Sequence, residues 1–449
     1  MPPAATRTAQ QPTTKRIPST DRIVLQGTPQ RRQQAIARRR AHGVTDERIA
    51  HARELLRTYV SPLPSPLTLH RDLSAVVSSI LGRTIAVAVI DATAQRPGEH
   101  RTGSFKDYAP IELYERVRSG TPPDEVHVVS TGNHALATVN AVMRVNALHG
   151  THVRAIATMD IDASAAKKNA IRRAGGVVRE HAPLLRDPRS RAARWLCRTY
   201  DALVAQGWLR GSPIRSYKEG EDIVNAMTSP RCMRIPHDNL FTANGYAVLA
   251  VEAIEQLQAC GIDPVHAAPG SIVALAPMGS GGLMRGWLEW SAQTTATVLG
   301  VSAPPATSTF DSLREGRALR IDVPSDSAFA CDGILATTEE SAFREIRDLA
   351  DGALLVHDMD AVVASALLLR CGFVSECTSG LPLAGLLLHD DLAPDARCAV
   401  MVLTSNHLDP RHRATLDAWA ADLNAIREYI VARRKGAAVH EAMRVLRAA

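Results

Sequence analysis

Residues 126–148 have the sequence VHVVSTGNHALATVNAVMRVNAL, and this stretch decides the fold class. Its first part, 126–130, is a short β-branched run of the kind that forms a buried strand. Thr131-Gly132-Asn133 follows directly, and an alanine-rich helical segment then continues to about Leu148. A strand that passes through a small polar turn into a helix is the building unit of α/β proteins.

Strands of the same kind recur on both sides of this stretch. Apolar β-branched runs occupy 85–90, 153–158, 272–275, 298–301 and 399–403. An Ala/Lys/Arg helix follows the run at 153–158, and we expect it to stop at Gly175-Gly176. Alternating strands and helices predict an α/β architecture with largely parallel sheets.

The first part of the chain, residues 1–60, differs from the rest in charge. It contains 12 Lys/Arg and 4 Asp/Glu, whereas the whole chain has a net charge of +6, so the remaining residues are nearly balanced. We expect 1–30 to be disordered and 29–59 to be helical, with Thr45 as a helix N-cap. The proline-rich run 61–67 breaks any helix and marks a domain boundary. We expect this basic arm to be a solvated tail or to contact another subunit of an oligomer. Binding of nucleic acid or of an acidic partner is the less favoured alternative.

The remaining bulk features predict a cytoplasmic protein. Seven cysteines are scattered without a CxxC pair, so neither a zinc site nor a disulfide framework is indicated. No stretch approaches about 18 uninterrupted apolar residues, and the polar N-terminus lacks the apolar core of a secretory signal. We therefore expect reduced thiols, no bound metal and no membrane span.

A lysine follows a small-residue turn in Thr102-Gly103-Ser104-Phe105-Lys106-Asp107. A lysine that forms a Schiff base must be neutral for part of the time, which burial promotes. The small residues would let the Lys106 amine reach a bound cofactor, and a following helix would fix it. For the motif taken alone, an ordinary solvated lysine is the favoured interpretation.

The turn after the strand at the start of the opening stretch contains Ser130, Thr131, Gly132, Asn133 and His134. Backbone amides and a hydroxyl at a helix N-terminus can hold a carboxylate, and an asparagine amide can reach a phenolic oxygen. The histidine offers an acid or base, although packing or capping is the commoner role. An ordinary helix cap is the alternative for the whole turn.

A glycine-rich loop follows the run at 272–275, with the sequence Pro277-Met278-Gly279-Ser280-Gly281-Gly282-Leu283. Glycines in a strand–loop–helix turn let backbone amides close on a phosphate. The loop has neither the lysine of a Walker A motif nor a well-placed GxGxxG. We therefore expect it to hold a small phosphate group rather than a nucleotide, with a tight turn as the alternative.

The run at 399–403 leads into Thr404-Ser405-Asn406-His407. A hydroxyl at this strand end can hydrogen-bond a pyridine nitrogen without protonating it, unlike a carboxylate. Thr404 is the expected partner, and Ser405 is the neighbouring alternative. A helix cap would explain the segment taken alone.

Together these four segments resemble the tryptophan-synthase-beta-like superfamily of fold-type-II pyridoxal-phosphate enzymes, over roughly residues 60–410. TGSFKD is similar to that family's lysine motif, STGNHA to its asparagine loop and GSGGL to its glycine phosphate loop. Further similarities fall in the same order, at Pro64–Leu67, at 166–176 and at Glu376 with Ser379, Gly380 and Ala384. The resemblance implies two α/β lobes with pyridoxal 5'-phosphate between them, bound to Lys106 as a Schiff base.

Within this superfamily the threonine synthase branch is the most similar. Leu403–Pro410, with the sequence LTSNHLDP, resembles that branch's LTGHGLKDP ending with one residue fewer. The chain departs from the family pattern at Tyr108 in place of arginine, at Cys377 in place of proline, at Ser280 in the glycine loop and throughout 187–241. These departures keep the cofactor scaffold but point away from phosphohomoserine as the substrate, toward a specialised relative.

The resemblance implies a basic arm at 1–60, a large cofactor-binding lobe from 61–125 and 236–449, and a smaller mobile lobe at 126–235. Lys106 is the expected catalytic residue and cofactor ligand. The other expected cofactor contacts are Asn133, Gly279, Ser280, Gly281, Gly282, Thr404 and Ser405. The expected substrate contacts are Ser130, Thr131, Gly132 and His134.

The expected reaction is elimination or replacement at the β or γ carbon of an amino acid, as in threonine synthase. Lys106 would be displaced by the substrate amine and would then remove the α-proton. The alternatives are an amino-acid dehydratase or ammonia-lyase, a β-replacement synthase similar to cysteine synthase, and a non-catalytic relative that only binds the cofactor. The resemblance also implies a homodimer, whose partner subunit the basic arm could wrap.

Overall fold

The structure, a computed structural model, describes residues 21–25, 29–97, 99–130, 132–160, 163–181, 231–237, 239–319 and 329–448. The disorder expected at 1–30 is wrong for Arg22–Val24, which form a strand that pairs with 352–354. The expectation for 1–20 and the binding role expected of Thr131 lie outside the described ranges.

A seven-stranded sheet, in the order β1-β10-β9-β8-β11-β3-β2, forms the centre of the larger lobe. Its strands are β1 (Arg22–Val24), β2 (Leu67–Leu69), β3 (Ala86–Asp91), β8 (Ile272–Pro277), β9 (Thr297–Ser302), β10 (Gly352–Leu355) and β11 (Cys398–Leu403). The inner strands run parallel, whereas β1 and β2 at the edges pair antiparallel with their neighbours. A parallel sheet is buried on both faces, and successive residues of β11 accordingly alternate between two apolar clusters.

Helices cover both faces of this sheet. One cluster packs α9 (Leu240–Ala259), α10 (Gly282–Trp287), α11 (Glu289–Gln293), α12 (Ser308–Glu315) and α13 (Glu340–Leu349). The other packs α3 (Arg71–Leu81), α14 (Asp358–Arg370), α15 (Leu381–Leu388), α16 (Pro410–Ala421), α17 (Leu423–Arg434) and α18 (Val439–Ala448). Short 3-10 turns complete the lobe at η1 (Phe105–Tyr108), η2 (Asp332–Ile334), η3 (Cys377–Gly380) and η4 (Asp390–Leu392). Among the described helices, none is long and apolar enough to span a bilayer.

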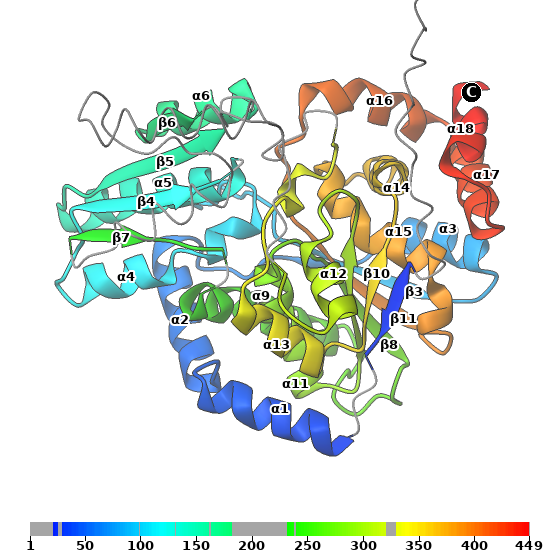
Figure 1. Cartoon of the computed structure of the whole chain (residues 1–449), viewed down its shortest axis with the longest axis horizontal. Helices are drawn as coiled ribbons and strands as arrows, with labels where there is room; N and C mark the ends of the chain where they lie inside the picture. The colour runs from blue at the N-terminus through cyan, green and yellow to red at the C-terminus, as the bar shows by residue number, and fades with distance from the viewer. Residues whose placement is uncertain are drawn as a thin grey trace, which may run out of the picture.

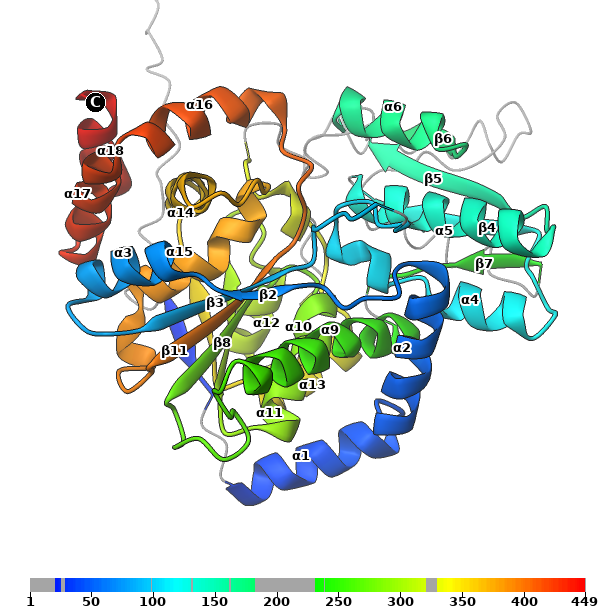
Figure 2. The same ribbon diagram turned by 180° about the vertical axis from the view of Figure 1, so that it is seen from behind.

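A four-stranded parallel sheet, in the order β6-β5-β4-β7, forms the smaller lobe. Its strands are β4 (Glu125–Val129), β5 (Arg154–Asp160), β6 (Val177–His181) and β7 (Cys232–Arg234), and its neighbouring helices are α4 (Ile111–Arg118), α5 (Asn133–His149) and α6 (Ala165–Arg173). Both views of the ribbon show this sheet at one end of the molecule, beside the larger lobe (Figure 1, Figure 2).

The predicted strands are confirmed as β3, β4, β5, β8, β9 and β11, and the α/β class with mostly parallel sheets is confirmed with them. The helix expected after the turn at Asn133 is α5, and α6 ends just before Gly175, which has a φ of +93°. Five strands were not predicted, namely β1, β2, β6, β7 and β10. Strands β1, β2 and β7 have only 3 residues each, too few for a periodic pattern to be distinguished from a loop, and β6 and β10 have only 5 and 4.

The helical part of the basic arm folds back onto its own chain. It forms α1 (Pro29–Ala41) and α2 (Asp46–Tyr59), and the Thr45 side chain caps α2 by accepting a hydrogen bond from the Arg48 amide, as predicted. Helix α1 packs against α13, and α2 packs against α9 (Figure 2). The Arg39 and Glu289 side chains are both 0% exposed and form an ion pair of 3.0 Å. A charge from the arm is therefore part of the core of the larger lobe.

Replacing Arg39 by alanine should lower the free energy of unfolding by about 3 kcal/mol, because a buried carboxylate loses one of its cationic partners. The matched control is Arg38→Ala in the same helix, where the side chain is 51% exposed and pairs with Asp348. It should cost less than about 1 kcal/mol. Equal losses for the two variants in chemical unfolding would contradict this account of the arm.

Candidate active site

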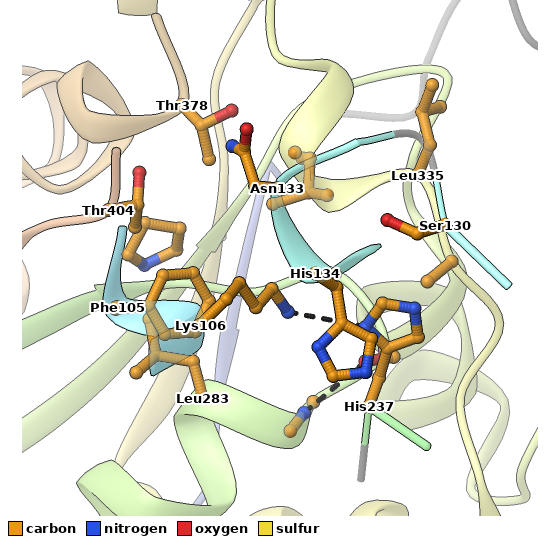
Figure 3. A pocket seen from close by; sticks show the side chains of 18 of the residues that line it. Phe105, Lys106, Ser130, Asn133, His134, His237, Leu283, Leu335, Thr378 and Thr404 are labelled. Atoms are coloured by element: carbon orange, nitrogen blue, oxygen red, sulfur yellow. Dashed lines mark hydrogen bonds between the residues drawn. The ribbon is translucent and has the colours of Figure 1, made fainter. Parts of the chain in front are cut away.

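Three of the sequence motifs lie at the carboxyl ends of parallel strands. Ser130 follows β4, Gly279 lies just beyond β8, and Thr404 follows β11. Ligands of open α/β sheets bind beyond these strand ends. A pocket lies there, and most of the predicted site residues line it, namely Lys106, Ser130, Asn133, His134, Gly279, Ser280, Gly281, Gly282 and Thr404 (Figure 3).

The segment before Lys106 is attached to the end of β11. The Phe105 amide donates to the Thr404 carbonyl at 2.9 Å, and the Ser104 hydroxyl donates to the same oxygen at 3.0 Å. Ser104 and Ser405 also form an isolated antiparallel bridge. These contacts set where the Lys106 side chain begins, and its Nζ lies 4.5 Å from the centroid of the Phe105 ring.

The two residues after Lys106 are buried and point into the protein. The Asp107 carboxylate accepts hydrogen bonds from the Thr102 amide and hydroxyl, both at 2.8 Å, and burial raises its pKa to about 6. The Tyr108 hydroxyl donates to Glu252 at 2.9 Å. Neither Asp107 nor Tyr108 lines the pocket, so both fix the turn that presents the lysine.

Glu376 connects two of the predicted cofactor contacts. Its carboxylate accepts a hydrogen bond from the Asn133 amide nitrogen at 2.8 Å and another from the Thr404 hydroxyl at 3.0 Å. The side chain lines the pocket, and burial raises its pKa while the nearby Lys167 ammonium opposes the rise. The sequence drew attention to Glu376 only within a family resemblance, without a role in the site.

The glycine loop is packed so closely that side chains are excluded. A Cβ atom on Gly279 would lie 2.5 Å from the Ile334 carbonyl oxygen. Gly281 has a φ of +96°, which strongly favours glycine. The Ser280 hydroxyl accepts from the Gly282 amide at 3.4 Å. The loop thus brings bare backbone to the pocket wall, as a phosphate cradle requires.

The turn before α5 supplies both a cap and a neutral histidine. The Ser130 hydroxyl accepts from the amides of Gly132 at 2.9 Å and Ala135 at 3.3 Å, which are helix-capping bonds. The His134 Nε2 lies 2.9 Å from the Ile235 carbonyl, and burial, aided by the charge of Lys106, lowers its pKa to about 3. His134 is therefore uncharged near neutral pH.

Two of the predicted residues, Ser405 and Gly132, do not line the pocket. Thr404 lines the pocket, whereas Ser405 does not, and the Ser405 hydroxyl accepts from the His407 amide at 3.0 Å. Gly132 is also outside the lining. A Cβ on Gly132 would lie 2.3 Å from the Lys167 side chain, so its place is structural.

Three parts of the lining were not predicted. One is His237, which follows β7 and belongs to the stretch 187–241 that matched no family motif. Another is the segment 333–336, which begins within η2 and faces the glycine loop. The third is Thr378 in η3. Neither His237 nor 333–336 has a motif of its own, because long-range packing alone brings them to the pocket.

The lining suits a ring that carries polar substituents and a phosphate. The Asn133 Oδ1, His134 Nδ1 and Thr378 Oγ1 atoms are buried, and none has a hydrogen-bond partner within the described part of the chain. All three residues line the same pocket as the lysine amine and the bare glycine loop. Buried polar atoms of this kind normally have partners, so a polar ligand that supplies them fits the site.

Solved structures of known proteins resemble this fold. A threonine deaminase from T.th. is 24% identical, with a TM-score of 0.56 over 81% of this chain and 98% of that one. Maize serine racemase is 18% identical, with a TM-score of 0.58 over 82% and 95%. Diaminopropionate ammonia lyase from Escherichia coli is 16% identical, with a TM-score of 0.57 over 84% and 93%. No curated protein sequence matches the chain.

Replacing Gly279 by alanine should weaken binding of pyridoxal phosphate at least about tenfold, because the new methyl group would push the loop away from Ile334 and spoil its amide geometry. Fluorescence titration of the apoprotein with the cofactor measures the change. The matched control is Gly82→Ala, a surface glycine with nothing within 4 Å of the new Cβ, which should leave the affinity unchanged. Unchanged affinity in Gly279→Ala would show that the loop does not hold the phosphate.

The chain also matches the family described as "Pyridoxal-phosphate dependent enzyme" over residues 93–405. That range contains the lysine turn, the asparagine turn, the glycine loop and Thr404. With the fold and the fitting pocket, it settles the family and the cofactor. The chain belongs to the pyridoxal-phosphate-dependent enzymes of the tryptophan-synthase-beta-like fold type II, and its cofactor is pyridoxal 5'-phosphate.

Proposed function

We propose that this enzyme catalyses elimination at the β carbon of an amino acid, releasing a keto acid and ammonia as a dehydratase or ammonia-lyase does. The observation that carries the proposal is the arrangement of the Lys106 amine, Asn133 and the Thr404 hydroxyl around one pocket. In the cofactor-bound enzyme the Thr404 hydroxyl would turn its hydrogen from Glu376 to the pyridine nitrogen and leave that nitrogen unprotonated, which favours elimination or replacement over transamination. The threonine deaminase and the diaminopropionate ammonia lyase that share the fold carry names of this reaction class.

Each lining residue has a distinct role in this proposal. Bound pyridoxal phosphate supplies the electron sink. The glycine loop at 279–282 would hold the phosphate through its amides, and the second hydrogen of the Asn133 amide nitrogen would be available to the phenolic oxygen. Lys106 Nζ would take the α-proton of the substrate, because this amine lies in the pocket and becomes free once the substrate amine displaces it. The Ser130–His134 turn binds the substrate carboxylate.

An ion pair between the lobes supports this arrangement. Lys167 of α6 lies 2.8 Å from Asp332 of η2, and the Lys167 side chain packs over Gly132. Because α6 belongs to the smaller lobe and η2 to the larger one, the pair holds the carboxylate-binding turn against the pocket. Such a contact limits the entry of water and raises the strength of the electrostatic interactions inside.

A threonine synthase type of reaction is the second candidate. It rests on Thr404 within the segment Leu403–Pro410, the part of the chain that resembles that branch. This reaction would remove a phosphate from the γ carbon and add water at the β carbon, so it would release phosphate and no ammonia. The products therefore distinguish the two candidates.

The test is to incubate the holoenzyme with serine, threonine, homoserine, 2,3-diaminopropionate and their phosphorylated or acetylated analogues, and to assay keto acid, ammonia and phosphate. We expect keto acid and ammonia with at least one substrate, and a loss of about 10²–10⁴-fold or more in Lys106→Ala. Lys435→Ala, at an exposed lysine in the C-terminal helical segment, is the matched control and should keep full turnover. Phosphate release without ammonia would favour the second candidate, and wild-type turnover in Lys106→Ala would overturn both.

A further inference from the structure

His237 faces the reactive nitrogen of the site. Its Nδ1 lies 3.3 Å from Lys106 Nζ, and its ring lines the pocket. Figure 3 shows the Lys106 side chain extended toward the imidazoles of His134 and His237. Lys106 is already assigned to the α-proton, whereas nothing described so far has a role for this histidine.

The hydrogen bonds of His237 fix which nitrogen carries its proton. Its Nε2 lies 3.1 Å from the Val129 carbonyl oxygen, which can only accept. Nε2 therefore carries the hydrogen in the neutral ring, and Nδ1 presents a lone pair to Lys106 Nζ. The same reasoning applies to His134, whose Nε2 faces the Ile235 carbonyl.

The surroundings of His237 keep its ring uncharged at rest. The groups that face it are Lys106 from η1, His134 from α5, with ring centroids 4.2 Å apart, and Arg234 from β7. Burial and these positive or protonatable groups hold the His237 pKa well below its usual value of 6.5. An imidazolium formed here would be a stronger acid than an exposed one, so it would give up its proton more readily.

We propose that His237 is a second proton carrier, which accepts at Nδ1 the proton that Lys106 removes from the substrate and passes it to the leaving group. This inference rests on the elimination reaction proposed above. The proposal gives His237, which follows β7 of the smaller lobe, a catalytic role through its direct contact with Lys106 Nζ.

The proton balance closes without any further reactant. The α-carbon loses a proton to the Lys106 amine, which becomes an ammonium group. The ammonium passes a proton to His237 Nδ1 and is again a neutral amine. The bond from the β carbon to the heteroatom breaks, its electron pair stays on the heteroatom, and the heteroatom takes the proton from His237.

The test compares His237→Asn with His127→Asn in the holoenzyme. An asparagine oxygen can accept the hydrogen bond from Lys106 as Nδ1 does, but it cannot carry the proton. His127 is the matched control, because it is a buried histidine of the same sheet that bonds to Glu125 at 2.9 Å and lies outside the pocket lining. The reaction is run in D₂O, and two amounts are measured: the deuterium incorporated at the α-carbon of the recovered substrate, which reports exchange, and the keto acid formed, which reports elimination.

In His237→Asn, kcat should fall at least about tenfold with little change in KM, because proton delivery is lost while substrate binding remains. Lys106 should still exchange the α-proton, so the ratio of exchange to elimination should rise at least about tenfold. His127→Asn should keep the wild-type ratio. A wild-type ratio in His237→Asn, or exchange and elimination that fall together, would overturn the role of His237. If His237→Asn does not fold, His237→Gln serves the same comparison.

A spectroscopic readout separates this inference from the proposed reaction. In the ¹⁵N-histidine-labelled apoprotein at pH 7, where Lys106 is a free amine, His237 should be a neutral ring with its hydrogen on Nε2, and its Nδ1 signal should shift in Lys106→Ala. A charged ring, or a hydrogen on Nδ1, would overturn the inference even in an active enzyme. Absence of turnover with every substrate would instead rule out the proposed elimination reaction. The nitrogen spectra would still report whether Lys106 and His237 form a hydrogen bond.

Discussion

The hydrogen bonds that join the Ser104–Phe105 segment to the Thr404 carbonyl are the constraint on which the site depends. The two partners are 300 residues apart in the sequence, and both bonds converge on one carbonyl oxygen at the end of β11. β11 is paired on both sides in the seven-stranded sheet and is fully buried. The base of the Lys106 side chain is therefore fixed to a buried central strand of the larger lobe, and the same strand end presents the Thr404 hydroxyl.

The other groups reach this fixed point from the ends of further strands. β8 delivers the bare glycine loop, and β4 of the smaller lobe delivers the turn that begins at Ser130. Glu376 joins the lobes inside the pocket, because its carboxylate bonds to Asn133 from the smaller lobe and to Thr404 from the larger one. Precise placement of several groups from separate elements is what catalysis by positioning requires. These contacts explain how groups from the two lobes are held together around one pocket.

Much of the fold and of the site could be predicted, because the signals are local. β-branched runs followed by small polar turns predicted β4, β8 and β11, and the residue types in those turns predicted the groups that line the pocket. His237 and Glu376 could not be assigned roles in this way, since their positions depend on contacts between distant segments. The same holds for Arg39, which resembles its exposed neighbours in a basic run but lies buried beside Glu289. Only the packing of α1 against the larger lobe distinguishes it.

The most direct test of the central claim is to reduce the holoenzyme with borohydride, digest it and locate the attached cofactor by mass spectrometry. Reduction makes a lysine–cofactor bond permanent, so the method identifies the lysine that holds pyridoxal phosphate in the resting enzyme. The account predicts the added mass on the peptide that contains Lys106, with loss of the absorbance near ~410–430 nm that a lysine-bound cofactor gives. Attachment to another lysine, or to none, would contradict the account.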